Sequence, residues 1–348
     1  MKLEIGNFYV RDIVFGDRLS YQDGVLTIQK EEALEFIKQD DRITEAELYI
    51  VKPGDKVRLC PVKEAIEPRV RPDGRSAFPG YTGDLAPAGS GVTHALKNCS
   101  VLVVGRHWGG FQDGLIDMSG EGQKYTLFGQ FNNLVLVADT NEEFEKREQQ
   151  KKNDALRRAG HRLAEYVAGC VKELVPEETE VFELGGMIKR DAETEKLPSV
   201  VYVMQPQSQM EEMGYNDLVY GWDMNHVVPT VMHPNEILDD AMVSGSFMPV
   251  SSKWSTYDFQ NCPNIKALYR EHGKTINFLG VIMSNLNVAL EQKERSAQFV
   301  AQIANSLGAD GAVVAEEGYG NPDADFVACI VALENAGVKT VGVTNECT

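Results

Sequence analysis

Carboxylate side chains occupy two glycine-containing segments of the sequence, each directly after an apolar run. HWGGFQDGLIDMSGEG follows SVLVVGR and contains Asp113 and Asp117, and EEGYGNPDADF follows GAVVA and contains Glu317 and Asp323. Ligands of α/β proteins lie at the carboxyl ends of strands, in loops of this kind. Carboxylates there can hold an ammonium group or donate a proton, whereas they repel phosphate. We therefore predict that these four residues bind a small amine substrate.

A structural role is the alternative explanation for the same two segments. Glycines turn the chain between a strand and a helix, and carboxylates cap the helix N-terminus. No Walker A motif is present, and Gly318 and Gly320 are followed by Asp323 where a dinucleotide-binding motif has its third glycine. The sequence therefore does not predict nucleotide binding.

The histidines and cysteines do not form a metal-binding pattern. His226 and His233 are seven residues apart, but Pro229 and Pro234 interrupt the segment, so the two rings do not share a predicted helix face. The six cysteines include no C-x-x-C pair. We predict structural histidines, mostly buried reduced thiols and no metal site.

Composition excludes several classes of protein. The net charge of −18 and the pI of about 4.8 disfavour nucleic acid as a partner, because an acidic surface repels phosphate. The apolar runs are too short to cross a bilayer, and the N-terminal residues mix charged and apolar side chains without a secretory signal. These features predict a cytoplasmic protein that binds neither membrane nor nucleic acid.

Hydrophobic patterning predicts an α/β protein with three regions. Residues 1–95 are β-rich, and residues 96–265 form an α/β region with long loops, irregular between 205 and 263. Residues 266–348 alternate strand and helix as β-α-β-α-β, with helices expected at 290–307 and 326–336. Short connections between these elements predict a doubly wound, mostly parallel sheet. Because the chain ends directly after the last strand, we expect truncation or processing there.

Several longer segments resemble one known family in their order and spacing. The similar segments are MKLEIGNFYVRDIVFGD, VKPGDKVRLCPVKEAIEPRV, GFQDGLIDMSG, NNLVLVAD, HPNEILDDAMVSG, YREHGKTINFLGVIMSN and KERSAQFVAQIANSLGADGAVVAEEGYGNPD. Together they resemble the proprotein-derived subunit of component B of glycine, sarcosine and betaine reductases, over nearly the whole chain. The resemblance implies an oxidoreductase subunit that pairs with a selenoprotein or thiol subunit in an oligomeric complex and acts on a small amino acid.

The resemblance also implies a covalent pyruvoyl group, formed when the proprotein cuts itself at a cysteine. The expected cysteine would follow HPNEILDDAMVSG, but the sequence continues SFMPVSSKW without one. Cys262, in an Asn-Cys pair, and Cys347, near the end, are the remaining candidates for this catalytic position, although Cys262 also fits an ordinary loop thiol. Cleavage directly after Thr348, with the pyruvoyl group on the next residue, is a further alternative. The alternatives are a scaffold subunit or an amino-acid-binding protein that makes no pyruvoyl group.

Overall fold

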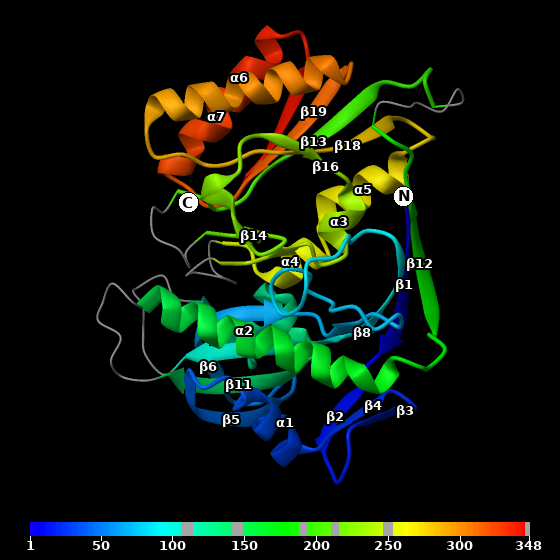
Figure 1. The fold of residues 1–348 in the computed structure, drawn as a ribbon, viewed down its shortest axis with the longest axis vertical. Helices are drawn as coiled ribbons and strands as arrows, with labels where there is room; N and C mark the ends of the chain where they lie inside the picture. The colour runs from blue at the N-terminus through cyan, green and yellow to red at the C-terminus, as the bar shows by residue number, and fades with distance from the viewer. Residues whose placement is uncertain (106–113, 141–148, 188–193, 210–215, 246–252, 345–348) are drawn as a thin grey trace.

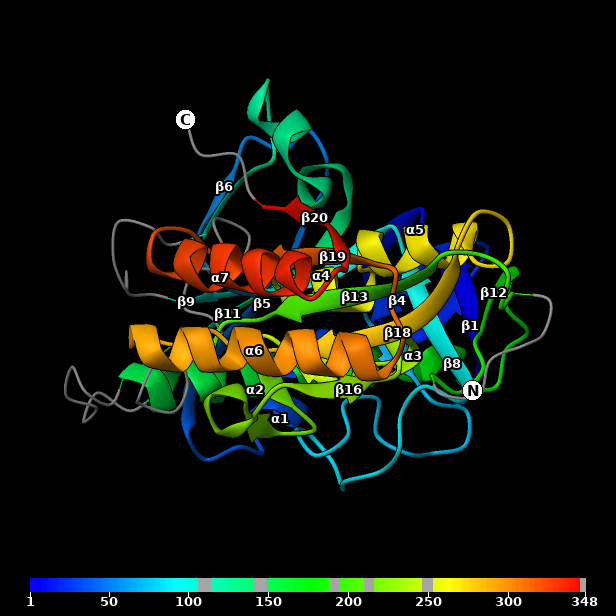
Figure 2. The same ribbon diagram turned by 90° about the horizontal axis from the view of Figure 1, so that it is seen from above.

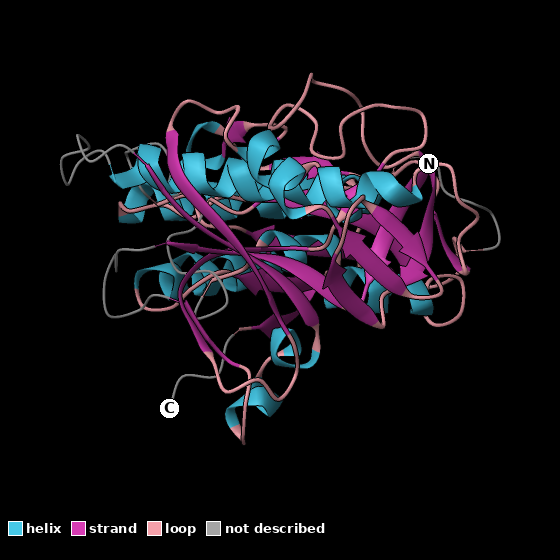
Figure 3. Ribbon diagram, turned by 90° about the horizontal axis from the view of Figure 1, so that it is seen from below, coloured by secondary structure: helices cyan, strands magenta, loops and turns pink. Residues whose placement is uncertain are grey.

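The computed structural model describes residues 1–105, 114–140, 149–187, 194–209, 216–245 and 253–344. The described residues contain both helices and strands (Figure 3); strands predominate up to residue 140, and strands and helices alternate in the last third. The predicted α/β class is therefore confirmed.

A five-stranded sheet, called here the upper sheet, contains the strands of the last third. Its order is β16 (Thr230–Met232), β18 (Asn277–Met283), β13 (Ser199–Gln205), β19 (Gly311–Glu316) and β20 (Lys339–Val343). The last four strands are parallel, and only β16 is antiparallel to its neighbour. The prediction of a mostly parallel sheet is thus confirmed. Strands β13 and β16 come from the predicted region 96–265, so the sheet combines that region with 266–348.

Helices cover both faces of the upper sheet. On one face α6 (Leu290–Ser306) and α7 (Asn321–Asn335) lie side by side over the strands (Figure 2) and share an apolar core with them. On the other face lie α3 (Pro234–Leu238), α4 (Thr256–Gln260) and α5 (Pro263–Glu271). Both faces are therefore shielded, as the continuous apolar strands require.

A second five-stranded sheet, the lower sheet, lies at the opposite end of the molecule (Figure 1). The long helix α2 (Gln149–Ala168) packs on it and buries Leu156, Leu163 and Val167. The strand order is β10 (Gly114–Asp117), β6 (Arg58–Ile66), β9 (Cys99–Gly105), β11 (Asn132–Thr140) and β5 (Ile43–Val51).

Smaller sheets complete the described chain. One has the order β12 (Glu178–Glu183), β1 (Lys2–Tyr9), β8 (Gly91–Lys97) and β7 (Arg69–Val70). The others are β2 (Asp12–Phe15), β4 (Val25–Ile28) and β3 (Ser20–Gln22), and β15 (Trp222–Asp223), β14 (Leu218–Val219) and β17 (Met242–Val243). The remaining helix is α1 (Lys30–Ile37), and 3-10 turns occur at Gly122–Tyr125, Leu127–Gln130, Gly169–Val171 and Met224–His226.

Helix α7 begins five residues before the position predicted from the apolar pattern. Its first turn is polar, so hydrophobic periodicity begins only at Phe326. The turn is nevertheless helical because Pro322 is compatible with a helix start and Asp323 Oδ2 accepts the backbone N–H of Gly320 at 3.0 Å. Asp323, which the sequence predicts to bind substrate, therefore caps this helix.

Candidate functional site

Polar side chains gather at the carboxyl edge of the upper sheet, where β13, β18 and β19 end. Successive residues of a strand point to opposite faces, so Glu316 faces the α6–α7 layer and Glu317 faces the α4 layer. The edge thus has two carboxylate groups on opposite sides of one strand. Each belongs to a separate polar cluster.

Asp217 and Glu317, called here the acid pair, are buried together on the α4 side. The backbone N–H of Gln207 donates to Asp217 Oδ2 at 2.9 Å and to Glu317 Oε2 at 3.0 Å. Asp217 Oδ1 accepts the N–H of Gly245 at 3.0 Å, and Glu317 Oε1 accepts the N–H of Trp254 at 2.9 Å. The exposed fractions of the two acids are 0% and 1%. Five separate chain segments therefore meet at these two buried carboxyl groups.

The environment of the acid pair disfavours two negative charges. Burial and the neighbouring Asp217 raise the pKa of Glu317 well above its ordinary value, and burial raises the pKa of Asp217. Lys253 lies beside the pair and donates to Gln207 Oε1 at 2.7 Å. Gly318, with φ of +96°, makes room for that amine, because a Cβ there would lie 2.1 Å from Lys253 Nζ.

Glu316 and Asp323 form the second cluster, on the α7 side of β19. Glu316 Oε1 accepts the hydroxyl of Thr344 at 3.1 Å, whereas its buried Oε2 has no hydrogen-bond partner. Burial and the adjacent Asp323 raise the pKa of Glu316 to about 7. Asp323 is exposed, so a cationic group can approach it from solvent, whereas Glu316 beside it is only 5% exposed.

A buried ion pair joins α6 and α7 next to the second cluster. Lys293 Nζ contacts the carboxylate of Asp325 and also donates to the Oδ1 of Asn321 at 2.7 Å. The other carboxylate oxygen of Asp325 accepts the N–H of Asn287 at 3.0 Å. Lys293 is 3% exposed, so its ammonium group interacts with these internal partners and not with solvent. The pair fixes the N-termini of α6 and α7 against each other.

The four predicted substrate-binding carboxylates are not all brought together. Glu317 and Asp323 both follow β19 but lie in different clusters. Asp117 belongs to β10 in the lower sheet, where its Oδ2 accepts Arg58 Nε at 2.9 Å and its Oδ1 accepts the N–H of Ser119. Asp113 lies outside the described residues. Asp117 therefore has a local structural role in the described chain, and its binding role stays a prediction.

Cys262 does not have the surroundings that a reactive pyruvoyl group requires. It precedes α5, is 4% exposed, and its thiol hydrogen-bonds with the Tyr202 hydroxyl. Burial raises the pKa of the Cys262 thiol. An amine substrate in water could not contact this atom, so the described structure does not fit a pyruvoyl group at Cys262. Cys347, the other predicted catalytic cysteine, lies outside the described residues.

The predicted histidines are separated in the structure. His233 caps α3, where its Nδ1 accepts the N–H of Asn235 at 3.2 Å, and burial lowers the pKa of His233 to about 4. His226 ends a 3-10 turn. Within the described ranges no group of three His, Cys, Asp or Glu side chains is arranged to hold a metal ion.

A buried network between the two large sheets was not predicted from the sequence. Glu64 Oε1, from β6, accepts the N–H of Ala65 at 2.9 Å and of Thr256 at 3.0 Å, and its Oε2 lies 2.9 Å from the Thr256 hydroxyl. That hydroxyl also lies 3.1 Å from Nε2 of His161 in α2 and accepts the N–H of Ser244 at 3.0 Å. Burial raises the pKa of Glu64 to about 7 and lowers the pKa of His161 to about 3.

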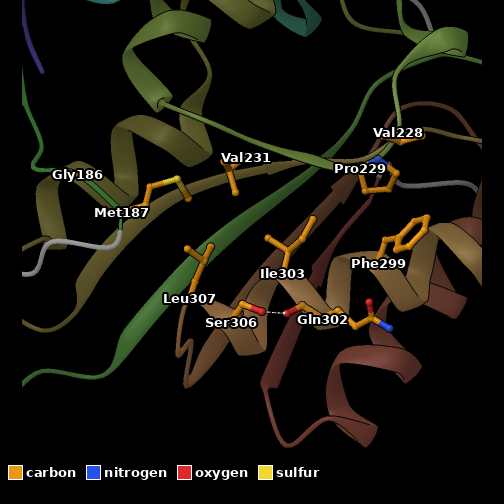
Figure 4. A pocket seen from close by; sticks show the side chains of 10 residues that line it. All are labelled: Gly186, Met187, Val228, Pro229, Val231, Phe299, Gln302, Ile303, Ser306 and Leu307. Carbon is orange, nitrogen blue, oxygen red and sulfur yellow. Dashed lines mark hydrogen bonds between the residues drawn. The ribbon is translucent and has the colours of Figure 1, made fainter.

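An apolar pocket of about 800 Å³ lies apart from these polar clusters (Figure 4). Phe299 and Ile303 of α6 form one wall together with Leu307, which follows this helix, and another wall is formed by Val231 of the edge strand β16 and by Pro229 just before it. None of the residues that line it carries a charge. The pocket therefore offers apolar contact but no acid, base or ion-binding group.

Comparison with known proteins identifies the family. Residues 1–348 match the model of the glycine/sarcosine/betaine reductase component B subunits. The chain belongs to this family. It is 71% identical over 349 residues to the betaine reductase complex component B subunit alpha of Peptoclostridium acidaminophilum, covering 100% of this chain and 79% of that protein.

Other component B relatives are more distant. The glycine reductase complex component B subunits alpha and beta of Peptoclostridium acidaminophilum are 39% identical over 347 residues, covering 99% of this chain and 80% of that protein. The sarcosine reductase complex component B subunit alpha of the same organism is also 39% identical, with the same coverage. No solved structure matches the chain. As a component B subunit, the chain is part of a multi-component oxidoreductase.

No helix in the described part of this component B subunit is long and apolar enough to cross a membrane.

Proposed function

We propose that this component B subunit acts in a betaine-type reductase, in which the C–N bond of an N-methylated glycine is cleaved reductively. The observation that carries the proposal is the difference in similarity: 71% identity to the betaine relative against 39% to the glycine and sarcosine relatives. Substrate specificity depends on the side chains around a site, and a chain that shares more of its residues with one relative is expected to share more of these side chains with it.

The missing cysteine after HPNEILDDAMVSG supports the same substrate class. A pyruvoyl carbonyl activates an amine by forming a Schiff base, and this requires N–H groups on the nitrogen. Betaine has a quaternary nitrogen and cannot form that bond. A betaine-type subunit therefore does not need the cysteine at this position.

The chemistry that we propose is a displacement at the methylene carbon of the substrate. A selenolate or thiolate of a partner subunit attacks that carbon, and the C–N bond breaks. The electron pair leaves with nitrogen as a neutral tertiary amine, while the carboxymethyl group stays on selenium or sulfur. This displacement does not consume a proton, because the leaving nitrogen was already positively charged.

The second cluster is the best-placed candidate for the substrate cation. Asp323 is exposed, so a positive nitrogen can contact it from solvent, and the buried Glu316 beside it adds negative charge to the site when it is ionised. The fixed Lys293–Asp325 pair behind them keeps α7 in place. Carboxylates interact with a quaternary ammonium group by charge alone, which matches a ligand without N–H donors.

Reconstitution tests the proposal. The purified chain is combined with the remaining components of the reductase complex and supplied with betaine, sarcosine or glycine. We expect release of trimethylamine from betaine, at a rate well above that of amine release from the other two substrates. Preferential release of ammonia or methylamine would refute the betaine assignment.

A matched pair of variants tests the location of the site. Asp323→Asn should weaken binding of betaine by about tenfold, because one charge beside the cation is lost. Glu334→Gln removes an exposed carboxylate at the other end of α7 and should leave binding unchanged. Equal betaine affinity of both variants in calorimetry would exclude the α7 cluster.

A scaffold subunit without its own chemistry is the second candidate, and the burial of Cys262 favours it over a pyruvoyl subunit. Intact mass before and after treatment with borohydride distinguishes the two. A chain cut at Cys262 or Cys347, with a new N-terminus that borohydride reduces, would establish a pyruvoyl group. An uncut chain that co-purifies with a catalytic partner would establish the scaffold.

A further inference from the structure

The acid pair joins five segments of the chain at the carboxyl edge of the upper sheet. Gln207 follows β13, Gly245 follows β17, Trp254 precedes α4, and the acids themselves come from Asp217 and the end of β19. The Gln207 N–H is shared between one oxygen of each acid, which brings these two oxygens against each other. Two negative oxygens in such contact, away from water, repel strongly unless a proton lies between them.

The charged groups that face the acid pair do not remove this repulsion. Lys253, before α4, donates to the side-chain oxygen of Gln207 and, at 3.4 Å, to the backbone oxygen of Glu317. Asp258, in α4, adds a further negative charge near Glu317. The pair thus has one cation beside it and no direct ion pair with it among the described residues.

We propose that Asp217 and Glu317 hold one proton between them, and that this proton positions Gly245 and Trp254 at the carboxyl edge for the reductase reaction. The second part rests on the proposed function. With the proton present, one carboxyl group donates to the other, and all four oxygens keep their hydrogen bonds to the backbone. Without it, the two acids separate, and the N–H groups of Gly245 and Trp254 lose their fixed acceptors.

Hydrogen-bond counting gives the substitutions that test the shared proton. In Glu317→Gln, the amide oxygen can accept from Trp254 while the amide N–H₂ donates to Asp217, and Gln207 still donates to Asp217. In Asp217→Asn, the same scheme holds with the roles exchanged. Each single amide variant therefore keeps the arrangement without a dissociable proton. The double amide variant leaves at least one of the backbone donors without an acceptor.

The emission of Trp254 gives a readout that does not depend on turnover. In a background with Trp108→Phe and Trp222→Phe, we expect the emission of Trp254 to shift to the red as pH rises and the pair loses its proton. Either single amide variant should remove this shift, and the double variant should be red-shifted at every pH. Glu334→Gln, at the surface, should titrate as the parent does. A shift that persists in Glu317→Gln and Asp217→Asn overturns the shared proton.

The pH profile of the reconstituted reductase tests the positioning role. We expect kcat for betaine to fall at alkaline pH, with the same midpoint as the change in Trp254 emission. In Glu317→Gln, this alkaline fall in kcat should disappear. Glu317→Ala, which removes the acceptor for Trp254, should lower kcat about 10- to 100-fold. If kcat of Glu317→Gln falls at alkaline pH as that of the parent does, the shared proton has no positioning role in the reaction. Absence of any turnover of betaine would refute the proposed function, while the fluorescence still decides the shared proton.

Discussion

Replacement of Glu64 by Gln tests whether a buried acid between the two sheets is neutral. The ring of His161 donates from Nδ1 to the carbonyl oxygen of Arg157 at 2.8 Å, so the neutral ring must accept at Nε2. Thr256 has one hydroxyl proton, which cannot serve both His161 and an ionised Glu64. A protonated Glu64 removes the conflict, because it donates to Thr256, and Thr256 donates to His161.

The size of the expected effect follows from the pKa of Glu64, which burial raises from 4.5 to about 7. The folded state then holds a proton that the unfolded state has released between these two pH values. This contribution to stability is complete below pH of about 4.5 and is lost as pH rises to about 7. A shift of this size corresponds to roughly 3 kcal/mol of unfolding free energy.

Gln reproduces the protonated acid, since its oxygen can accept from Ala65 and Thr256 and its N–H₂ can donate to the Thr256 hydroxyl. Glu64→Gln should therefore be about as stable as the parent near pH 4.5 and more stable by up to roughly 3 kcal/mol at pH 8. His161, whose pKa is lowered to about 3, acts in the opposite direction: its contribution grows between pH 3 and 6.5. The comparison is therefore clearest above pH 6.5, where His161 is neutral in both states.

Urea unfolding at a series of pH values, followed by circular dichroism, measures this difference. Glu334→Gln serves as the surface control and should follow the parent at every pH. Glu64→Ala should be less stable throughout, because it leaves the N–H groups of Ala65 and Thr256 without an acceptor. A Glu64→Gln variant that is less stable than the parent at pH 8 would show that Glu64 is ionised in the folded protein.

Two further predictions concern buried groups near the upper sheet. Lys293→Met should lower the unfolding free energy by about 3–5 kcal/mol, since Asp325 would be left buried without its cation, and adding Asp325→Leu should restore much of the loss in urea unfolding. Cys262 should react with iodoacetamide at least about 100-fold more slowly in the native protein than in urea, because its thiol is buried and protonated. Mass spectrometry measures this labelling, and rapid labelling of Cys262 in the native state would contradict its buried position.

Strands β13, β18, β19 and β20 of the upper sheet could be predicted from short, mostly apolar runs next to glycine or polar turns, whereas the edge strand β16 lies in the irregular stretch 205–263 and was not predicted. The position of Glu317 and Asp323 after β19 followed from the same pattern. Their separation did not, because it depends on which face each side chain takes after the strand ends. Asp117 was predicted from a similar local sequence, but its strand pairs with β6 in another sheet.

Asp217 and Lys253 could not be predicted from local sequence. They lie in the irregular stretch 205–263, where no apolar period indicates which side chains point inward. Asp217 is buried and Lys253 is placed beside it because segments 110 residues apart meet, such as those of Gln207 and Glu317. Glu64 presents the same difficulty, because its partner Thr256 is 192 residues away. The spacing of residues within one segment does not indicate contacts between segments so far apart in the sequence.

The residues just before and inside α4 connect the two acids that we expect to be protonated. Glu317, from the upper sheet, accepts the N–H of Trp254, and Glu64, from the lower sheet, accepts the N–H of Thr256. Ser244 also connects these residues, because its hydroxyl donates to the carbonyl oxygen of Trp254 at 2.9 Å.

If either acid loses its proton, the backbone N–H group that the other acid accepts should therefore become less fixed in position. Glu64→Gln should move the pH midpoint of the Trp254 emission upward, and the effects of Glu64→Gln and Glu317→Gln on stability should not add. Strict additivity in a double-mutant cycle at pH 8 would show that the two acids titrate independently, although only one residue separates the backbone groups they hold.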